Sequence, residues 1–409
     1  MRGAKTRLAG WWFALAAVVG CSSSNGAVGA DASTVDDAHG RDGTTAVRDA
    51  GALEASPAKD ARSAAIDAAT TDARPDVSIT DARPDVSMTD ARPESTTADA
   101  HAEADVADAA CPPGACLVTL ASGQNQPSAV ATDGINIYWT DLAAGAIVQL
   151  PVGGGTPLTM ASSQNQPDGI ATDGKNVYWT DGMGGTINQI AVGTSNGTPL
   201  VLASGQGEIQ AIATDGKNVY WTGMTMSTVN QIAVGTNNGT PVVLESGRSG
   251  CNGIATDGVN VYWNEAGTST VNQLPVGAVN GTPLVLASGQ DVFFGIATDG
   301  KNVYWSTFSS SGGTHKGTIN QIAVGAVHGT PIVLASGQLT ADFLTTDAKN
   351  VYWTDQAAGT VSQVSVGLAF GPEVQLASAQ MTPHGVATDG KEVFWVDLFG
   401  HTVMETAVR

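Results

Sequence analysis

The pattern of apolar and polar positions changes character near residue 117. Beyond it, short apolar runs rich in Val, Ile, Tyr and Trp alternate with turns rich in Gly, Asn and Asp. Runs of this length, bounded by turn residues, are typical of β-strands. In one such stretch the pattern predicts four strands, at Asp168–Thr172, Asn176–Thr180, Thr186–Val192 and Thr198–Ala203, with a tight turn at Asp173.

This four-strand stretch is one copy of a repeat. The segment Ala-Thr-Asp-Gly-Lys-Asn-Val-Tyr-Trp-Thr-Asp, which begins at Ala171, returns along the chain with small changes. Its turn aspartate marks seven copies: Asp133, Asp173, Asp215, Asp257, Asp299, Asp347 and Asp389. Asn-Gly pairs at 196–197, 238–239 and 280–281 predict hairpin turns with positive φ between the third and fourth strands. Four short strands in a unit of about 40–45 residues are typical of a β-propeller blade.

The two ends of the repeat region complement each other. Leu117–Gly123 matches the fourth strand of a unit, while the seventh unit stops at Arg409 after three strands. An N-terminal strand that completes the last blade closes the ring and leaves no long open edge. The sequence therefore predicts an all-β fold over residues 117–409, a seven-bladed β-propeller of four-stranded antiparallel blades.

The centre of each repeat resembles a known motif. Three copies read Tyr-Trp-Thr-Asp, at Tyr138, Tyr178 and Tyr352, and four are looser, at Tyr220, Tyr262, Tyr304 and Phe394. They resemble the YWTD repeat of the low-density-lipoprotein-receptor class B propellers, across essentially all of residues 117–409. The resemblance implies a binding scaffold without naming a ligand. YWTD propellers have six blades and this chain predicts seven, so no receptor-specific residue is carried over.

Residues 1–20 have the layout of a signal peptide. Arg2, Lys5 and Arg7 precede the apolar run Leu8–Val19, which is too short to span a bilayer. The run ends in Val-Val-Gly-Cys at Cys21, which resembles a bacterial lipobox. An ordinary signal peptide with a chance cysteine is the alternative. The resemblance implies acylation of Cys21 and attachment to a lipid bilayer in the bacterial cell envelope, at the outer membrane.

Residues 21–110 predict a disordered linker. They are rich in Ala, Asp, Thr and Pro, and no aromatic residue occurs between Phe13 and Tyr138. Such a segment cannot bury enough apolar surface to offset its conformational entropy. At the junction, residues 111–116, Cys111 and Cys116 flank a Pro-Pro-Gly turn. In an exported protein this arrangement favours a short disulfide, and it leaves Cys251 as a small buried residue.

The net charge of −20 argues against a nucleic-acid partner, because such proteins usually carry a basic stripe. We define the top face as the side of the ring where the first strand of each blade begins. The predicted loops of this face carry almost exclusively acidic charge: Asp141, Asp168, Asp181, Glu208, Glu265, Asp291, Asp342, Asp355 and Asp397. A negative surface attracts cations or basic partners, although it can equally serve only for solubility.

The variable positions of a repeat are where a ligand site is expected, since the constant ones hold blades together. The position five residues before each turn aspartate enters the top of the central channel. It reads Ser128, Asp168, Gln210, Asn252, Phe294, Asp342 and His384, with Phe293 adding an apolar neighbour. We expect these eight residues to face a ligand.

Histidine and carboxylate also meet in the loops of the seventh unit. His384, Asp397 and His401 suggest a metal site or a general acid and base, although they lack a local ligand spacing. A seven-bladed exported propeller with such residues is similar to the streptogramin lyases in fold and residue type only.

Two functions follow from the sequence. The favoured one is a non-enzymatic, membrane-anchored binding scaffold that uses its acidic top face for a protein, peptide or glycan and needs no cofactor. The alternative is a metal-assisted lyase or hydrolase with a divalent cation in the seventh blade. A purely structural envelope protein is a third possibility.

Overall fold

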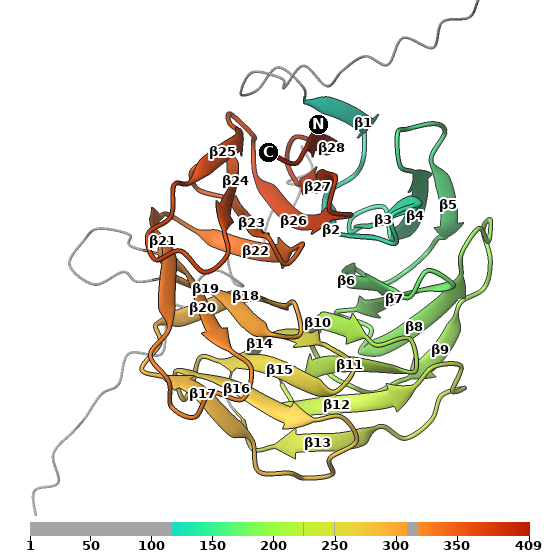
Figure 1. Cartoon of the computed structure of the whole chain (residues 1–409). Coiled ribbons are helices and arrows are strands. Elements are labelled where there is room, and N and C mark those ends of the chain that lie inside the picture. Colours follow the sequence, from blue (N-terminus) through green and yellow to red (C-terminus); the bar gives the residue numbers. More distant parts are fainter. Residues whose placement is uncertain (1–116, 224, 249, 309–316) are drawn as a thin grey trace, which may run out of the picture. The chain divides into compact units, whose positions relative to one another are not determined.

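The computed structural model describes residues 117–409, apart from 224, 249 and 309–316 and the side chains of 210 and 292–294. These residues form seven four-stranded antiparallel sheets arranged as blades around a central channel (Figure 1). The seven-bladed all-β prediction is confirmed. The predicted signal peptide, the linker, Cys21, Cys111 and Cys116 lie outside the described residues. No helix in the described part is long and apolar enough to cross a membrane.

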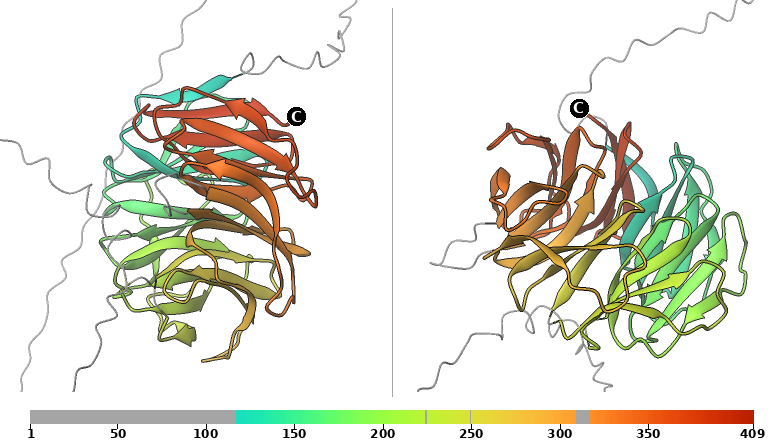
Figure 2. Two further views of the ribbon diagram at one scale, coloured as in Figure 1. Left: turned by 90° about the vertical axis from the view of Figure 1, so that its left-hand side faces the viewer. Right: turned by 60° about the horizontal axis from the view of Figure 1, so that its bottom comes forward.

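Within a blade the strands run from the channel outward in chain order, and the side views in Figure 2 show the twist of each sheet. Blade 1 is β2 (Pro127–Thr132), β3 (Asn136–Asp141), β4 (Ala146–Pro151) and β5 (Leu158–Ala161). Blade 2 is β6 (Pro167–Thr172), β7 (Asn176–Asp181), β8 (Thr186–Ala191) and β9 (Leu200–Ala203). Blade 3 is β10 (Ile209–Thr214), β11 (Asn218–Gly223), β12 (Thr228–Ala233) and β13 (Val242–Ser246). Blade 4 is β14 (Cys251–Thr256), β15 (Asn260–Glu265), β16 (Thr270–Pro275) and β17 (Leu284–Ser288). Blade 5 is β18 (Val292–Thr298), β19 (Asn302–Phe308), β20 (Gly317–Ala323) and β21 (Ile332–Gln338). Blade 6 is β22 (Ala341–Thr346), β23 (Asn350–Asp355), β24 (Thr360–Ser365) and β25 (Val374–Ala377).

Blade 7 closes the ring. It consists of β26 (Pro383–Thr388), β27 (Glu392–Asp397), β28 (Thr402–Ala407) and, as its outer strand, β1 (Val118–Ser122). β1 pairs antiparallel with β28, from Val118 opposite Glu405 to Ser122 opposite Thr402. The predicted one-plus-three closure is confirmed, so the described chain enters and leaves the ring within one sheet.

The aromatic residues of the repeat pack between blades, as predicted. Tyr138 of blade 1 lies in one buried cluster with Trp179 of blade 2, and the same pairing recurs around the ring. At the closure Phe394 of blade 7 clusters with Trp139 of blade 1. Every blade thus buries a tryptophan against its predecessor, and this stacking is what the constant Tyr-Trp pair provides.

The turn aspartates perform the local role predicted for them. In blade 2, Asp173 Oδ1 accepts hydrogen bonds from the N–H groups of Lys175 and Asn176. Its Oδ2 accepts the hydroxyl of Tyr178 at 2.9 Å, which explains why tyrosine precedes the tryptophan. The three bonds lower the pKa of the Asp173 carboxyl. Burial, followed by the bond to Asp173, raises the pKa of the Tyr178 hydroxyl.

The Asn-Gly pairs differ from the expectation. Asn196 has the predicted positive φ of 46°, but the connection from β8 to β9 is too long for a tight hairpin. Instead, the N–H groups of Asn196 and Gly197 donate to the carbonyl oxygens of Thr159 and Met160 in the outer strand of blade 1. The turn covers the exposed edge of the preceding blade, which protects that edge from pairing with another chain.

Candidate functional site

The threonine of the Tyr-Trp-Thr-Asp motif holds the channel-facing residues in place. Each inner strand has a register shift near its start, as between Pro127 and Val130 in β2. Thr140 of blade 1 accepts the N–H of Ala129 with its hydroxyl and donates that hydroxyl to the carbonyl oxygen of Asp168 in blade 2. Thr354 in blade 6 donates in the same way to the carbonyl oxygen of His384. The repeated threonine therefore fixes the backbone of the next blade's channel residue.

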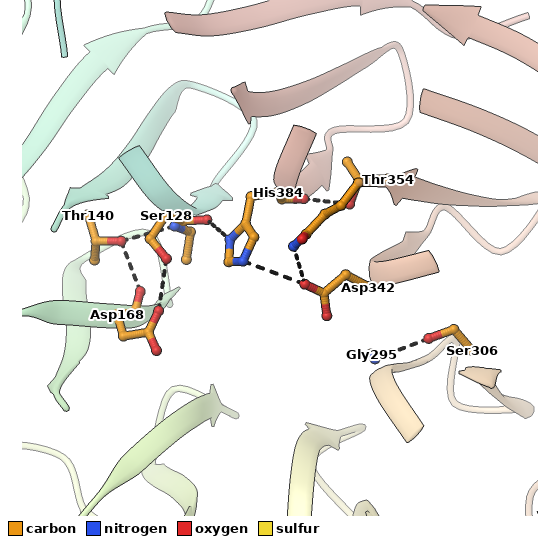
Figure 3. Close-up of polar contacts among 10 residues, drawn as sticks. Ser128, Thr140, Asp168, Gly295, Ser306, Asp342, Thr354 and His384 are labelled. Atoms are coloured by element: carbon orange, nitrogen blue, oxygen red, sulfur yellow. Dashed lines mark hydrogen bonds and ion pairs between the residues drawn. The ribbon is translucent and has the colours of Figure 1, made fainter. Parts of the chain in front are cut away.

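Four of the predicted residues meet at the top of the channel, across blades 6, 7, 1 and 2 (Figure 3). Ser128 donates its hydroxyl to Asp168 Oδ1 at 2.8 Å. His384 Nδ1 lies 2.6 Å from the carbonyl oxygen of Ser128, and its Nε2 lies 3.5 Å from Asp342 Oδ2. The four residues form one continuous polar chain over the closure of the ring.

Two further residues support this cluster, and the sequence reasoning missed both. Gln356 donates its side-chain amide to Asp342 Oδ2, and the Phe343 ring lies 4.5 Å from that of His384, centroid to centroid. Phe343 stands at the position where four of the other blades have glycine, a difference between repeats that was available in the sequence. Together they hold the imidazole of His384 in one orientation.

The proton positions in the His384–Asp342 pair follow from hydrogen-bond chemistry. A carbonyl oxygen only accepts, so Nδ1 of His384 carries a hydrogen toward Ser128. A neutral imidazole facing an ionised carboxylate would then place two lone pairs against each other. A proton between His384 Nε2 and Asp342 would remove this mismatch.

Asp168 has a different environment. Burial raises the pKa of its carboxyl, while the charge of His384 and the Ser128 hydrogen bond lower it. The pKa of Asp342 is also raised, by burial and by the charge of Asp168, against the opposing effect of His384. Among the described residues neither carboxylate pairs with lysine or arginine. Asp168 is thus a partly buried acid with no described lysine or arginine beside it.

A small cavity opens next to Asp168 on the top face. Its volume is about 90 Å³, and it is lined by Leu142, Gln166, Asp168, Gly182, Met183, Glu208 and Ile209 from blades 1, 2 and 3. The walls combine two carboxylates with the apolar side chains of Leu142 and Met183. A larger cavity of about 430 Å³ lies at the opposite end of the channel, among the Thr-Asp turns of blades 1, 6 and 7. The aspartates there already hold their own turns.

Of the other predicted channel residues, only Asn252 has a described side chain. Asn252 presents its carbonyl oxygen to Thr222, as the repeat requires. The side chains of Gln210, Phe293 and Phe294 lie outside the described part of the structure.

The three residues predicted for a metal site, His384, Asp397 and His401, lie in different settings. Asp397 Oδ1 and Oδ2 accept the N–H groups of Thr382 and Met381, and Oδ1 also accepts that of Gly400, so this carboxylate organises loops. His401 is exposed in a turn with a φ of 57°. Within the part of the chain that the structure describes, no three His, Cys, Asp or Glu side chains form a group able to hold a metal ion.

The acidic top face is also smaller than the sequence suggests. Five of its nine carboxylates are buried at the ends of second strands: Asp141, Asp181, Glu265, Asp355 and Asp397. Asp355, for example, accepts the N–H groups of Leu339 and Thr340. Glu208 and Asp291 are exposed and Asp168 and Asp342 are partly buried, so these four remain to interact with a ligand. The five buried acids all stand at the last position of the Tyr-Trp-Thr-Asp motif and the other four do not, so the repeat carried a signal that separates the two sets.

Cys251 is a buried free thiol, as predicted. Burial and the nearby charge of Glu265 raise the pKa of its thiol to about 12. The thiol stays protonated at neutral pH and is a poor nucleophile.

Comparisons with known proteins agree on the fold. No known family and no curated protein matches the chain by sequence. Among solved structures, a catalytically inactive virginiamycin B lyase from Staphylococcus aureus with quinupristin has a TM-score of 0.58 at 13% identity, covering 72% of this chain and 99% of that one. The hydrazine synthase of Kuenenia stuttgartiensis gives 0.56 at 14%, covering 70% and 97%. The WD40 propeller domain of Doa1 gives 0.55 at 11%, covering 72% and 98%. These neighbours include enzymes and a WD40 domain, so the likeness shows a shared β-propeller fold and no shared activity.

Proposed function

We propose that the protein is a binding module that accepts a positively charged group of a protein or peptide ligand on its top face, against Asp168. The observation that carries this proposal is the environment of Asp168. It is a partly buried carboxylate on a rigid inner strand, it lines a cavity with Glu208, and no described lysine or arginine compensates it.

The walls of the cavity narrow the chemistry of the ligand. Leu142 and Met183 offer apolar contact beside the carboxylates, and Met183 is 73% exposed. A lysine side chain matches such a site, because its methylene stem packs on apolar surface while its ammonium group reaches an acid. The cavity of about 90 Å³ exceeds the space that one water molecule requires.

The test uses the purified chain on arrays of lysine- and arginine-containing peptides and of amino-sugar glycans. We expect Asp168→Asn to raise the Kd of the bound peptides at least tenfold. Asp291→Asn removes one exposed acid elsewhere on the top face and is the matched control. Equal binding by wild type and Asp168→Asn would refute the proposal, and selective capture of glycans would change the ligand class.

We further propose that the lipobox-like sequence anchors this module to the bacterial cell envelope, at the outer membrane, through a lipid on Cys21. The support is the charged start, the apolar run and the cysteine in the first 21 residues. Labelling cells with an alkyne analogue of palmitate should mark the wild-type chain and leave Cys21→Ser unlabelled. Labelling of both chains, or of neither, would contradict the anchor.

A second candidate function rests on the His384–Asp342 pair. Its partly exposed imidazole lies 3.5 Å from a carboxylate, an arrangement that suits general acid–base catalysis by a lyase or hydrolase. With Asp397 bound to its loops, a divalent cation would have to use other ligands. Two results would favour the enzyme over the binding module. Mg²⁺ or Ca²⁺ would raise the melting temperature of the wild type but not of His384→Ala, and the wild type would turn over a substrate.

A further inference from the structure

Blade 7 departs from the other blades at one buried cross-strand pair near the bottom of the ring. In six blades the second strand begins with asparagine and the third strand carries a glutamine opposite the repeated tyrosine. In blade 1, Gln149 donates its amide to Asn136 Oδ1 at 3.1 Å, and Gln189 and Asn176 do the same in blade 2. The corresponding residues of blade 7 are Glu405 and Glu392.

The amide pair is matched for hydrogen bonding, whereas the acid pair is not. An amide has both donors and acceptors, but two ionised carboxylates have only acceptors. In the other blades the glutamine oxygen also accepts an N–H from the next blade, as Gln149 does from Gly193. In blade 7, Oε2 of Glu405 and Oε2 of Glu392 are both buried without a hydrogen-bond partner.

The strand that packs on the outer side of Glu405 carries no charged residue beside it. Glu405 is only 7% exposed, and β1 places Val118 and Thr119 beside it, neither of which titrates. The charged groups around the pair lie in nearby turns and at the chain end: Asp389 and Lys391 before β27, Asp133 in blade 1, and Arg409. Burial, followed by the charges of Glu392 and Asp389, raises the pKa of Glu405 to about 7.

We propose that Glu392 and Glu405 form a proton-dependent latch in the blade that closes the ring. With one shared proton, the carboxyl of one glutamate donates to the other and joins β27 to β28 as the amide pair does in blades 1 and 2. When that proton leaves, two like charges face each other in a buried site. β28 then loosens, and with it β1, which pairs only with β28.

The direction of the effect follows from linkage. Because the folded state holds this proton more tightly than the unfolded state, the latch contributes fully below the ordinary glutamate pKa. Its contribution is lost as the pH rises through about 7. The closure of blade 7 should therefore weaken between pH 5 and pH 9, and the other six blades should not respond in this way.

Hydrogen exchange of the full chain tests the latch, with rates corrected for the intrinsic effect of pH. We expect the protection of β1 and β28 amides to fall at least tenfold between pH 5 and pH 9. Glu392→Asn with Glu405→Gln, which gives blade 7 the pair of the other blades, should abolish this fall. Asn176→Glu with Gln189→Glu should introduce it into blade 2.

The controls separate the latch from the general acidity of the ring. Glu208→Gln with Asp291→Asn removes two exposed carboxylates and should leave the pH dependence of blade 7 unchanged. If the blade 2 variant does not fold, Glu405→Gln alone must still reduce the pH dependence of hydrogen exchange in β28. Equal loss of protection in wild type and in the Asn–Gln variant, or no loss in wild type, would overturn the proposal.

Discussion

At the scale of single residues, the repeat motif is a set of polar contacts as much as a set of aromatic rings. In six blades the tyrosine hydroxyl donates to the turn aspartate, as Tyr178 does to Asp173. In five blades the tryptophan indole donates to the glutamine fifteen positions earlier, as Trp179 does to Gln164. In blade 4 that glutamine is replaced by Arg248, which pairs with Glu245 and Glu265, and the Trp263 indole has no partner. Single contacts can therefore be lost without loss of the blade.

Replacing Tyr178 by Phe tests the weight of one such contact. We expect a loss of about 1 kcal/mol in the free energy of unfolding, because Asp173 loses one of its donors while the ring still packs. Denaturant unfolding measures it. Blade 7 already has Phe394 at this position, so a loss several times larger would show that the hydroxyl does more than hold the turn.

The raised pKa of Asp168 predicts how ligand binding depends on pH. A cationic ligand prefers the ionised carboxylate, so its affinity should rise with pH through a range above the ordinary aspartate pKa. Calorimetric titration of a lysine peptide between pH 4 and pH 8 checks this. Asp168→Asn should bind weakly and without that dependence, whereas an unchanged pH profile would assign the titration to another group.

At the scale of strands, the site depends on how closely the inner strands approach. Gly385 follows His384 in β26, and a Cβ atom there would lie 2.7 Å from the Cα of Ala129 and 2.8 Å from the nitrogen of Val130 in β2. Only glycine allows this approach, which also brings His384 to the carbonyl oxygen of Ser128. The distance between two neighbouring strands thus sets the geometry of the polar cluster.

Gly385→Ala should consequently destabilise the fold by about 1–3 kcal/mol, because backbone atoms must move apart. Gly182→Ala, whose added Cβ would meet its nearest atom at 3.4 Å, is the control and should be tolerated. Thermal unfolding compares the two variants, and NMR of the His384 ring reports on the cluster. Similar stability of both variants would contradict the argument.

At the scale of the whole molecule, closure depends on one short strand. β1 supplies the outer edge of blade 7 and buries Ala121 in the cluster that includes Trp139 and Val403. Without β1, strand β28 would present an open edge that favours pairing with other chains.

Deleting Val118–Ser122 should lower the melting midpoint by more than about 5 °C, since in a domain of this size about 1 kcal/mol corresponds to about 2 °C. It should also promote association, measured by light scattering. A deletion of equal length within the predicted linker, residues 86–90, is the control. A midpoint shared by both deletions would mean that the ring holds without its closing strand.

The sequence by itself determined the architecture of this protein. Blade number, strand order and the closing role of Leu117–Gly123 follow from the repeat. Its hydrophobic pattern is local, so the strands of each unit can be predicted from that unit alone. Only the tertiary structure decided which polar residues act together. Asp141 and Asp168 are equally acidic in sequence, yet Asp141 is buried and accepts a backbone N–H, whereas Asp168 faces a cavity. Likewise Ser128 and His384 meet because ring closure brings the first and last blades together, a contact that no local pattern encodes.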